Sequence, residues 1–468
     1  MKFHRYAGRN VLLLHRLPWA ALLLLPAGCQ SYHSKPLTPA AVGQALKIPP
    51  WRQLRVAVAK TSSEQLPPTM LSPSQAITPG RAAALALILN PSLRAIRDLH
   101  GEASAQLLQA GILSNPALTT SAGLVTGGYR TDTFSPYGIG VNWNIRQLID
   151  RQARISSARY QLKQVDLEVA WREWQTAAAA RLAVYAIAAA KRQLNEARRA
   201  QRELGKTYQR ARRASALGLV TLFDLGLALH ASQRADVLVL TSGQQLKLSQ
   251  LDLARVMGLP PGTVITLSHS LRLPVAVHLP SVAKLEQAVA SRRLDLLALR
   301  MGYQSQQQRL RAAVLRQFPR VNIGFQQASD NSNIHQTSFG VSIDLPIFNR
   351  NQGQIALAQA TRRALYDDYM ARVFNARSDI GATAVNIRSL QRRIRQAQAA
   401  VGKYNVLVSR DLQGLRTQAI DIPAYAVTLE QLVRQRILLV QLQDQLATNL
   451  IALELASGDA FFTQRVGQ

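Results

Sequence analysis

The chain has 468 residues, is 47% hydrophobic and only 6% aromatic, and carries a formal net charge of +30. This length can hold two or three ordinary domains with an ample core, and the abundance of Ala, Leu, Gln and Arg indicates long packed helices. The single cysteine, Cys29, excludes a disulfide or a thiolate metal cluster within one chain.

The first residues have the pattern of a secretory signal. Basic residues such as Lys2 and Arg9 precede an apolar stretch from Leu17 to Leu25, which is too short to span a bilayer because a membrane helix needs about 20 residues. We therefore expect residues 1–28 to be a signal peptide. The basic charge would otherwise favour nucleic acid as a partner, but an exported chain does not meet cytoplasmic nucleic acid.

Cys29 directly follows Ala27-Gly28. This order resembles a bacterial lipobox, in which the cysteine sulfur receives a diacylglyceryl group. Lipidation of Cys29 is the expectation, and Gln30 after it implies sorting to the outer membrane. The alternative is an ordinary cleaved signal with an incidental cysteine.

Residues 29–79 contain eight prolines and predict an extended N-terminal arm. Thr78 and Pro79 then have the pattern of a helix N-cap followed by proline at the first helical position. A helix is expected to follow, from about Gly80 to Leu113.

The sequence repeats itself at an offset of 200 residues. Gly140–Ile145 aligns with Gly340–Leu345, Thr221 with Asp421, and Gly258 with Gly458. Each copy predicts strands, a very long helix, a tight turn and a return helix. The expected divisions are a first repeat over 80–258, a linker over 259–280, a second repeat over 281–458 and a C-terminal tail over 459–468.

Apolar residues alternate with small or polar residues in three predicted strands. Period two over about nine residues is the signature of a transmembrane β-barrel strand; the alternative is a soluble, half-buried hairpin. The residues expected to face lipid are Ile139, Val141, Trp143, Val321, Ile323, Phe325, Phe339, Val341, Ile343 and Leu345.

Four strands per chain cannot close a barrel alone, because the smallest known bacterial barrels have about eight. Each chain is therefore expected to share a barrel with copies of itself. Three chains would supply twelve strands.

Long segments without proline follow the strands, over 146–216 and 347–417. About seventy helical residues would extend about 105 Å. Return helices are expected over 222–257 and 422–457.

The turns between these helices lie at 218–221 and 418–421. Gly218 suits a left-handed helix end, Thr221 can cap the next helix with Asp224 as its capping-box partner, and Asp421 can cap the other return helix. Capping alone explains most of these residues. The functional alternative is that the turns contact a partner protein and constrict a duct.

These features together resemble the outer membrane factor family, the TolC-like efflux ducts. The resemblance covers Thr78 to Gly458, and its subgroup is that of lipid-anchored members serving resistance-nodulation-division and cation-efflux pumps. The residues that carry it are Asn90–Arg94, Asn115-Pro116, Phe318-Pro319, Asn144-Ile145, Asp344–Phe348 and Gly218–Asp224.

The resemblance implies a mainly α fold with a small β part. It implies a homotrimer with a twelve-stranded barrel in outer-membrane lipid and an α-helical tunnel through the periplasm. The tunnel tip would contact a periplasmic adaptor and an inner-membrane pump through Gly218, Thr221, Asp224, Gln418 and Asp421. The aspartates that ring the narrowest point in the best-known member are Ala424 and Val427 here.

No enzyme, cofactor or metal chemistry is expected. The eight histidines include no helical i, i+4 pair, and the chain contains no Gly-x-Ser-x-Gly motif and no phosphate loop. The expected function is therefore a passive exit duct for small molecules or metal ions. The alternative is a periplasmic coiled-coil scaffold or adaptor without a pore.

Arginine clusters such as Arg392–Arg395 are expected to be solvated helix faces. The alternative is a positive tunnel lining that favours anionic cargo.

Overall fold

A computed structural model describes residues 31–47, 76–127, 134–269, 271–417 and 419–462. The predicted signal peptide, Cys29, Gln418 and the tail from residue 463 lie outside the described residues. The chain divides into two compact units, 1–48 and 49–468. None of the described helices combines the length and apolar character that crossing a membrane requires.

In the first unit, a short helix, α2 (Pro39–Ala45), interrupts the predicted extended arm. Thr38 caps it, because its hydroxyl accepts from the Ala41 amide at 3.2 Å. The expectation of a purely extended arm was wrong here. Proline is compatible with a helix at the first position, where its missing N–H would have no partner in any case.

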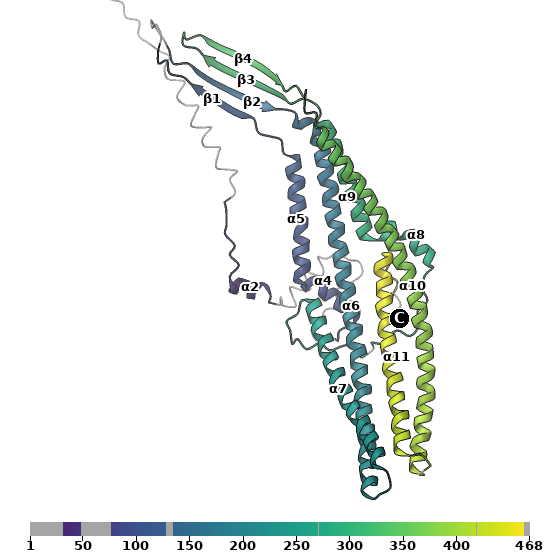
Figure 1. Ribbon diagram of the computed structural model, residues 1–468. Helices are drawn as coiled ribbons and strands as arrows, with labels where there is room; N and C mark the ends of the chain where they lie inside the picture. Colours follow the sequence, from purple (N-terminus) through teal and green to yellow (C-terminus); the bar gives the residue numbers. More distant parts are fainter. Residues whose placement is uncertain (1–30, 48–75, 128–133, 270, 418, 463–468) are drawn as a thin grey trace, which may run out of the picture. The chain divides into compact units, whose positions relative to one another are not determined.

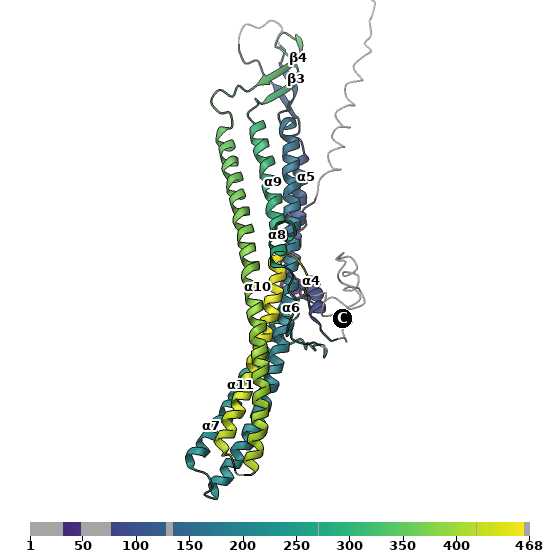
Figure 2. The ribbon, with the colours of Figure 1, turned by 90° about the vertical axis from the view of Figure 1, so that its right-hand side faces the viewer.

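The second unit is built mainly of helices, and the long ones lie side by side (Figures 1 and 2). α6 packs against α7 and α9, and α10 packs against α11. In chain order the elements are α4 (Pro79–Leu89), α5 (Pro91–Gly111), β1 (Ala117–Ala122), β2 (Tyr137–Asn144), α6 (Gln147–Ala216), α7 (Leu222–Met257), α8 (Val282–Arg292), α9 (Leu294–Leu315), β3 (Val321–Ser329), β4 (His335–Ile343), α10 (Gln352–Arg416) and α11 (Ile422–Ser457).

The single helix expected over 80–113 is divided in two at Asn90. Pro91 has no N–H to continue the hydrogen-bond ladder and disfavours helical geometry in the residue before it. Asn90 is accordingly extended, and its side chain caps α5 by accepting from the Ser92 amide at 2.9 Å. The second long helix also begins later than expected, at Gln352, after Asn351 in a left-handed conformation.

The four strands form one antiparallel sheet in the order β1-β2-β3-β4. Val141 pairs with Phe325, which in turn pairs with Phe339. Residues paired directly across antiparallel strands share a face. The register therefore places the alternating apolar residues of β2, β3 and β4 together on one face.

The 200-residue repeat is visible in the return helices. α7 and α11 both have 36 residues, and they end at Gly258 and Gly458, which have left-handed φ angles of 71° and 74°. Gly258 lies against the break between α4 and α5, and Gly458 lies against the break between α8 and α9. Each return helix thus ends in close contact with a pair of short helices from its own repeat.

The buried core follows the helix interfaces and is rich in alanine and leucine. Its largest cluster joins α6, α8, α9, α10 and α11, and a second cluster joins α4 to α6 and α7. The small alanine side chains in these clusters allow the helix backbones to approach closely. The two repeats therefore share one core and are not separate domains.

Asp444, on α11, has a pKa raised by burial. A carboxyl whose pKa is higher in the folded than in the unfolded state costs stability above its folded pKa, and the cost is relieved as pH falls through that value. Asp444→Asn should therefore stabilise the protein at neutral pH, by less than about 1 kcal/mol because part of the side chain is solvated. Chemical unfolding should show that the gain shrinks on acidification; a gain that grows would contradict this assignment.

Candidate functional site

The first candidate site is the apolar face of the sheet. The side chains of Ile139, Val141, Phe325, Phe339, Val341 and Ile343 on this face are between 44% and 70% exposed. No helix of the second unit packs closely over these strands within the described residues, since the strands' substantial contacts are with one another. Contiguous exposed apolar surface of this kind marks a site of contact with lipid or protein.

Two residues expected on this face differ from the others. Leu345 lies beyond the end of β4, where it is exposed. Trp143 pairs with Ile323 on the apolar face, but it is half-buried at the end of β2, and its indole N–H donates to the Ser114 carbonyl at 2.9 Å. Trp143 therefore joins the strand to the segment that follows α5.

The opposite face of the sheet is polar and contains small residues. Asn144 donates to the side-chain oxygen of Asn322 across β2 and β3 at 2.8 Å. A Cβ added at Gly138, Gly140 or Gly324 would meet a neighbouring side chain within 3.0 Å. The two faces of the sheet thus differ sharply in polarity.

The second candidate site is the pair of turns at the far ends of the long helices. Gly218 has a left-handed φ of 70°, as expected for the residue that ends α6. Thr221 accepts from the Asp224 amide at 3.1 Å, and the Asp224 carboxylate accepts from the Thr221 amide at 3.1 Å. The predicted capping box is confirmed.

In the second turn, Asp421 caps α11 by accepting from the Ala424 amide at 2.8 Å. Pro423 lies in the first turn of that helix, as expected. Ala424 and Val427 are exposed, so the positions where the resemblance implied aspartates present apolar side chains to solvent.

The structure brings the two turns together. Ile422, at the start of α11, is buried in a cluster with Ala211 of α6 and Ala228 of α7. The first turn also carries exposed apolar side chains, Leu217, Leu219, Leu222 and Phe223, each more than 70% exposed. These four residues define the apolar tip. Three of them lie within Gly218–Asp224, which carries part of the resemblance, but no regular period predicts that their side chains are exposed.

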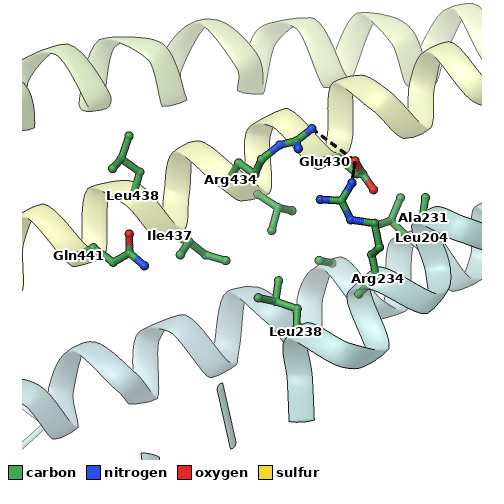
Figure 3. Close-up of a pocket in the computed structure, with 12 residues that line it drawn as sticks. Leu204, Ala231, Arg234, Leu238, Glu430, Arg434, Ile437, Leu438 and Gln441 are labelled. Carbon is green, nitrogen blue, oxygen red and sulfur yellow. Dashed lines mark hydrogen bonds and ion pairs between the residues drawn. The ribbon is translucent and has the colours of Figure 1, made fainter. Parts of the chain in front are cut away.

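A groove of about 340 Å³ lies between α6, α7 and α11 (Figure 3). It is largely apolar, with Leu204 and Leu238 on one side and Ile437 on the other. At one end Glu430 of α11 forms ion pairs with Arg234 of α7 at 3.6 Å and with Arg434 at 3.4 Å. Arg234 and Arg434 occupy equivalent positions in the two repeats.

Two further ion pairs join α11 to α6. Arg436 contacts Glu196 at 3.1 Å, and Arg181 contacts Glu454 at 2.7 Å. The second pair is buried, with 8% and 1% of its side chains exposed, whereas Arg234, Arg434 and Arg436 are 30% to 52% exposed. The sequence does not predict the Arg436–Glu196 and Arg181–Glu454 pairs, because their partners are 240 and 273 residues apart.

The described residues contain no group of three or more His, Cys, Asp or Glu side chains arranged to hold a metal ion. The main features of the second unit are a sheet with one apolar and one polar face, two helices of 65 and 70 residues, and a tip built from two turns. This combination defines a class of elongated helical proteins that end in a small antiparallel sheet.

Comparison with solved structures identifies the fold. The chain is similar to the outer membrane protein VceC from Vibrio cholerae (TM-score 0.69, 18% identity, covering 82% of this chain and 96% of that one). It is also similar to CusC (0.67, 17%, 82% and 92%). A third similar structure is the open state of the MtrE outer membrane channel from Neisseria gonorrhoeae (0.65, 17%, 81% and 89%). At these identities the similarities establish the fold, which is mainly helical and TolC-like, as expected.

One family model matches part of the sequence. The model of the family described as outer membrane efflux protein matches residues 285–459, which is most of the second repeat. No curated protein sequence matches the chain. The chain is therefore similar to outer membrane efflux proteins in the sequence of its second repeat and in its fold.

Proposed function

We propose that the chain is one protomer of a homotrimeric outer-membrane exit duct, through which an adaptor and an inner-membrane pump of the resistance-nodulation-division type expel small molecules or metal ions. The observation that carries the proposal is the sheet, which has one exposed apolar face, one polar face, and β1 and β4 as its outer strands. A barrel strand needs these two faces, because one contacts lipid and the other contacts water.

The strand lengths fit this role. β3 and β4 each have nine residues and so extend about 30 Å. A tilt of about 40° reduces their span along the membrane normal to about 23 Å, close to the apolar band of about 25 Å in outer-membrane barrels. Three copies of the four-stranded sheet would close a barrel of twelve strands.

The helices would continue the pore into the periplasm. α6 has 70 residues and α10 has 65, so each extends about 100 Å from the sheet to a turn. Cys29, outside the described residues, would add a lipid anchor at the outer membrane. A passive duct needs no enzyme, cofactor or resident metal, because the pump recognises the cargo.

The tip would bind the adaptor. The apolar tip offers buried area to a partner, and the capped turns hold it in place. An adaptor can open the duct only by binding the open arrangement more tightly than the closed one. The partly exposed pairs at Glu430 and Glu196 are weak enough to exchange during such a movement, whereas the buried Arg181–Glu454 pair would hold the helices together above them.

A poreless periplasmic adaptor is the competing function. An adaptor has no use for exposed Phe325, Phe339 and Val341 on one sheet face. Outer-membrane fractionation and heat-modifiable electrophoretic migration test the difference. A chain found only in the soluble periplasmic fraction would contradict the duct.

Two tip variants test the adaptor contact. Gly218→Pro cannot keep a φ of 70°, since proline fixes φ near −65°, and it also removes the amide that donates to Ser215. Asp224→Lys breaks the capping box and places a cation at the positive end of α7. Both should abolish export while trimers remain in the membrane.

Export is measured as drug or metal tolerance of cells that carry the matching pump, together with trimer yield in outer-membrane fractions. Gly218→Ala is the matched control, because it keeps the backbone amide and its Cβ meets nothing within 4 Å, so that it adds only left-handed backbone strain. Normal export by both the proline and lysine variants would remove the tip from the mechanism.

A further inference from the structure

An arginine cluster lies where the helices meet the sheet. Arg146 and Arg154 of the α6 end, and Arg316 and Arg320 from the segment between α9 and β3, line a cavity of about 310 Å³. Asp150 is the one carboxylate in this lining. Four guanidinium groups and one carboxylate leave a strong local excess of positive charge.

Both carboxylate oxygens of Asp150 accept hydrogen bonds from arginines of this cluster. Its Oδ1 accepts from Arg154 Nε at 3.0 Å, and its Oδ2 accepts from Arg316 Nε at 2.8 Å. Arg320 pairs with Asp344 at 3.2 Å, and both of these side chains are more than half exposed. Within the described residues, Arg146 forms no ion pair. The two acids therefore orient three of the arginines without neutralising the cluster.

The cluster lies on the polar side of the sheet. Asn144, which lines the cavity, pairs with Asn322 on the face opposite to Val141 and Ile323. Side chains alternate between the two faces of a strand. The cluster consequently continues the polar face of the sheet, and not the apolar one.

A second cavity supports this placement. It has a volume of about 530 Å³, shares Arg154 and Arg316 with the first, and adds Arg309. Its lining includes residues of α5, α6, α9 and α10, which pack in that order and connect to β1, β2, β3 and β4. The four helices form a curved row with α5 and α10 at its two ends, and one cavity can contact both end helices only on the concave side of this row. When several chains form a complete ring, the concave side of each row and the polar face of each sheet both face the lumen.

We infer that this arginine cluster is an anion-binding site inside the duct, and that it makes passage favour solutes bearing carboxylate or phosphate groups. The inference rests on the proposed function. Guanidinium groups bind both oxyanions through paired N–H donors. A narrow channel whose low-dielectric walls carry one sign of charge concentrates ions of the opposite sign. A trimer would place three copies of the cluster at the level where the barrel joins the tunnel.

The test is ion selectivity of purified trimers in planar lipid bilayers under a potassium chloride gradient. The wild-type reversal potential should show preference for chloride. Arg146→Gln combined with Arg320→Gln should shift the permeability ratio toward potassium by about threefold. These two arginines are chosen because neither contacts Asp150, so the buried contacts of that carboxylate remain.

Lys247→Gln combined with Arg255→Gln is the matched control. It removes the same charge from exposed positions on α7, which does not line either cavity, and should leave selectivity unchanged. Inorganic pyrophosphate should also lower the conductance of wild-type trimers in a concentration-dependent way, a result that needs no variant to fold.

The outcomes separate the two proposals. A pore that prefers potassium, or selectivity unaltered in the Arg146/Arg320 variant, would overturn the anion site and leave the duct intact. Trimers that form no pore at all would overturn the duct, and the anion site with it.

Discussion

Glu454→Ala should destabilise the protein by about 3–5 kcal/mol, because it would leave the Arg181 guanidinium buried without its counter-charge. Glu454 is completely buried in α11 and also accepts from the Phe462 amide. The Arg181 guanidinium lies 5.9 Å from the Phe462 ring centroid, so the same pair holds the end of the described chain. Chemical unfolding of the detergent-solubilised protein, followed by helical circular dichroism, measures the loss.

Two further variants distinguish the loss of the Arg181–Glu454 ion pair from a general effect of substitution on stability. The double variant Arg181→Leu, Glu454→Leu removes both charges and should recover most of the stability, since apolar residues often replace a buried ion pair without loss. Glu430→Ala should cost only about 1 kcal/mol or less, because its two arginine partners are about half exposed. Equal losses for Glu454→Ala and Glu430→Ala would contradict the distinction between the buried and exposed pairs.

Gly258→Ala should cost about 2–5 kcal/mol, which combines left-handed backbone strain with overpacking. Its Cβ would lie 2.6 Å from the Leu89 carbonyl oxygen and 2.8 Å from the Leu89 carbonyl carbon, and backbone atoms cannot move aside as a side chain can. The displacement would also disturb the hydrogen bond of 2.8 Å from Asn90 to the Val256 carbonyl.

Gly218→Ala provides a comparison at the same backbone conformation. Its φ of 70° matches the 71° of Gly258, but a Cβ there meets nothing within 4 Å. It should therefore show the strain alone, about 1–2 kcal/mol. Unfolding experiments on both variants in parallel measure the difference, and equal destabilisation would show that the contact with Leu89 contributes nothing.

Much of the fold is predictable because its signals are local. The absence of proline over about seventy residues predicts α6, and caps at Thr221 and Asp421 predict the starts of α7 and α11. Period two in β2, β3 and β4 predicts the strands and the shared face. Asn90-Pro91 carries an equally local signal for the break between α4 and α5, although a single helix was expected there.

The contacts between repeats could not be predicted in this way. Arg181 and Glu454 are 273 residues apart, and no periodicity or spacing relates them. The arginine cluster around Asp150 likewise draws on α6 and on the segment before β3, which the packing of α6 against α9 and the sheet register bring together. The apolar tip was also missed, since single exposed leucines in a turn have no pattern that distinguishes them from core residues.

The proposed duct has three chains that share one barrel of twelve strands. The mass of the detergent-solubilised protein, measured by light scattering with the detergent contribution subtracted, tests this requirement most directly. We expect a particle with three times the mass of one chain, and precipitation when detergent is removed without lipid. A stable monomer that remains soluble in water without detergent or lipid would contradict the shared barrel.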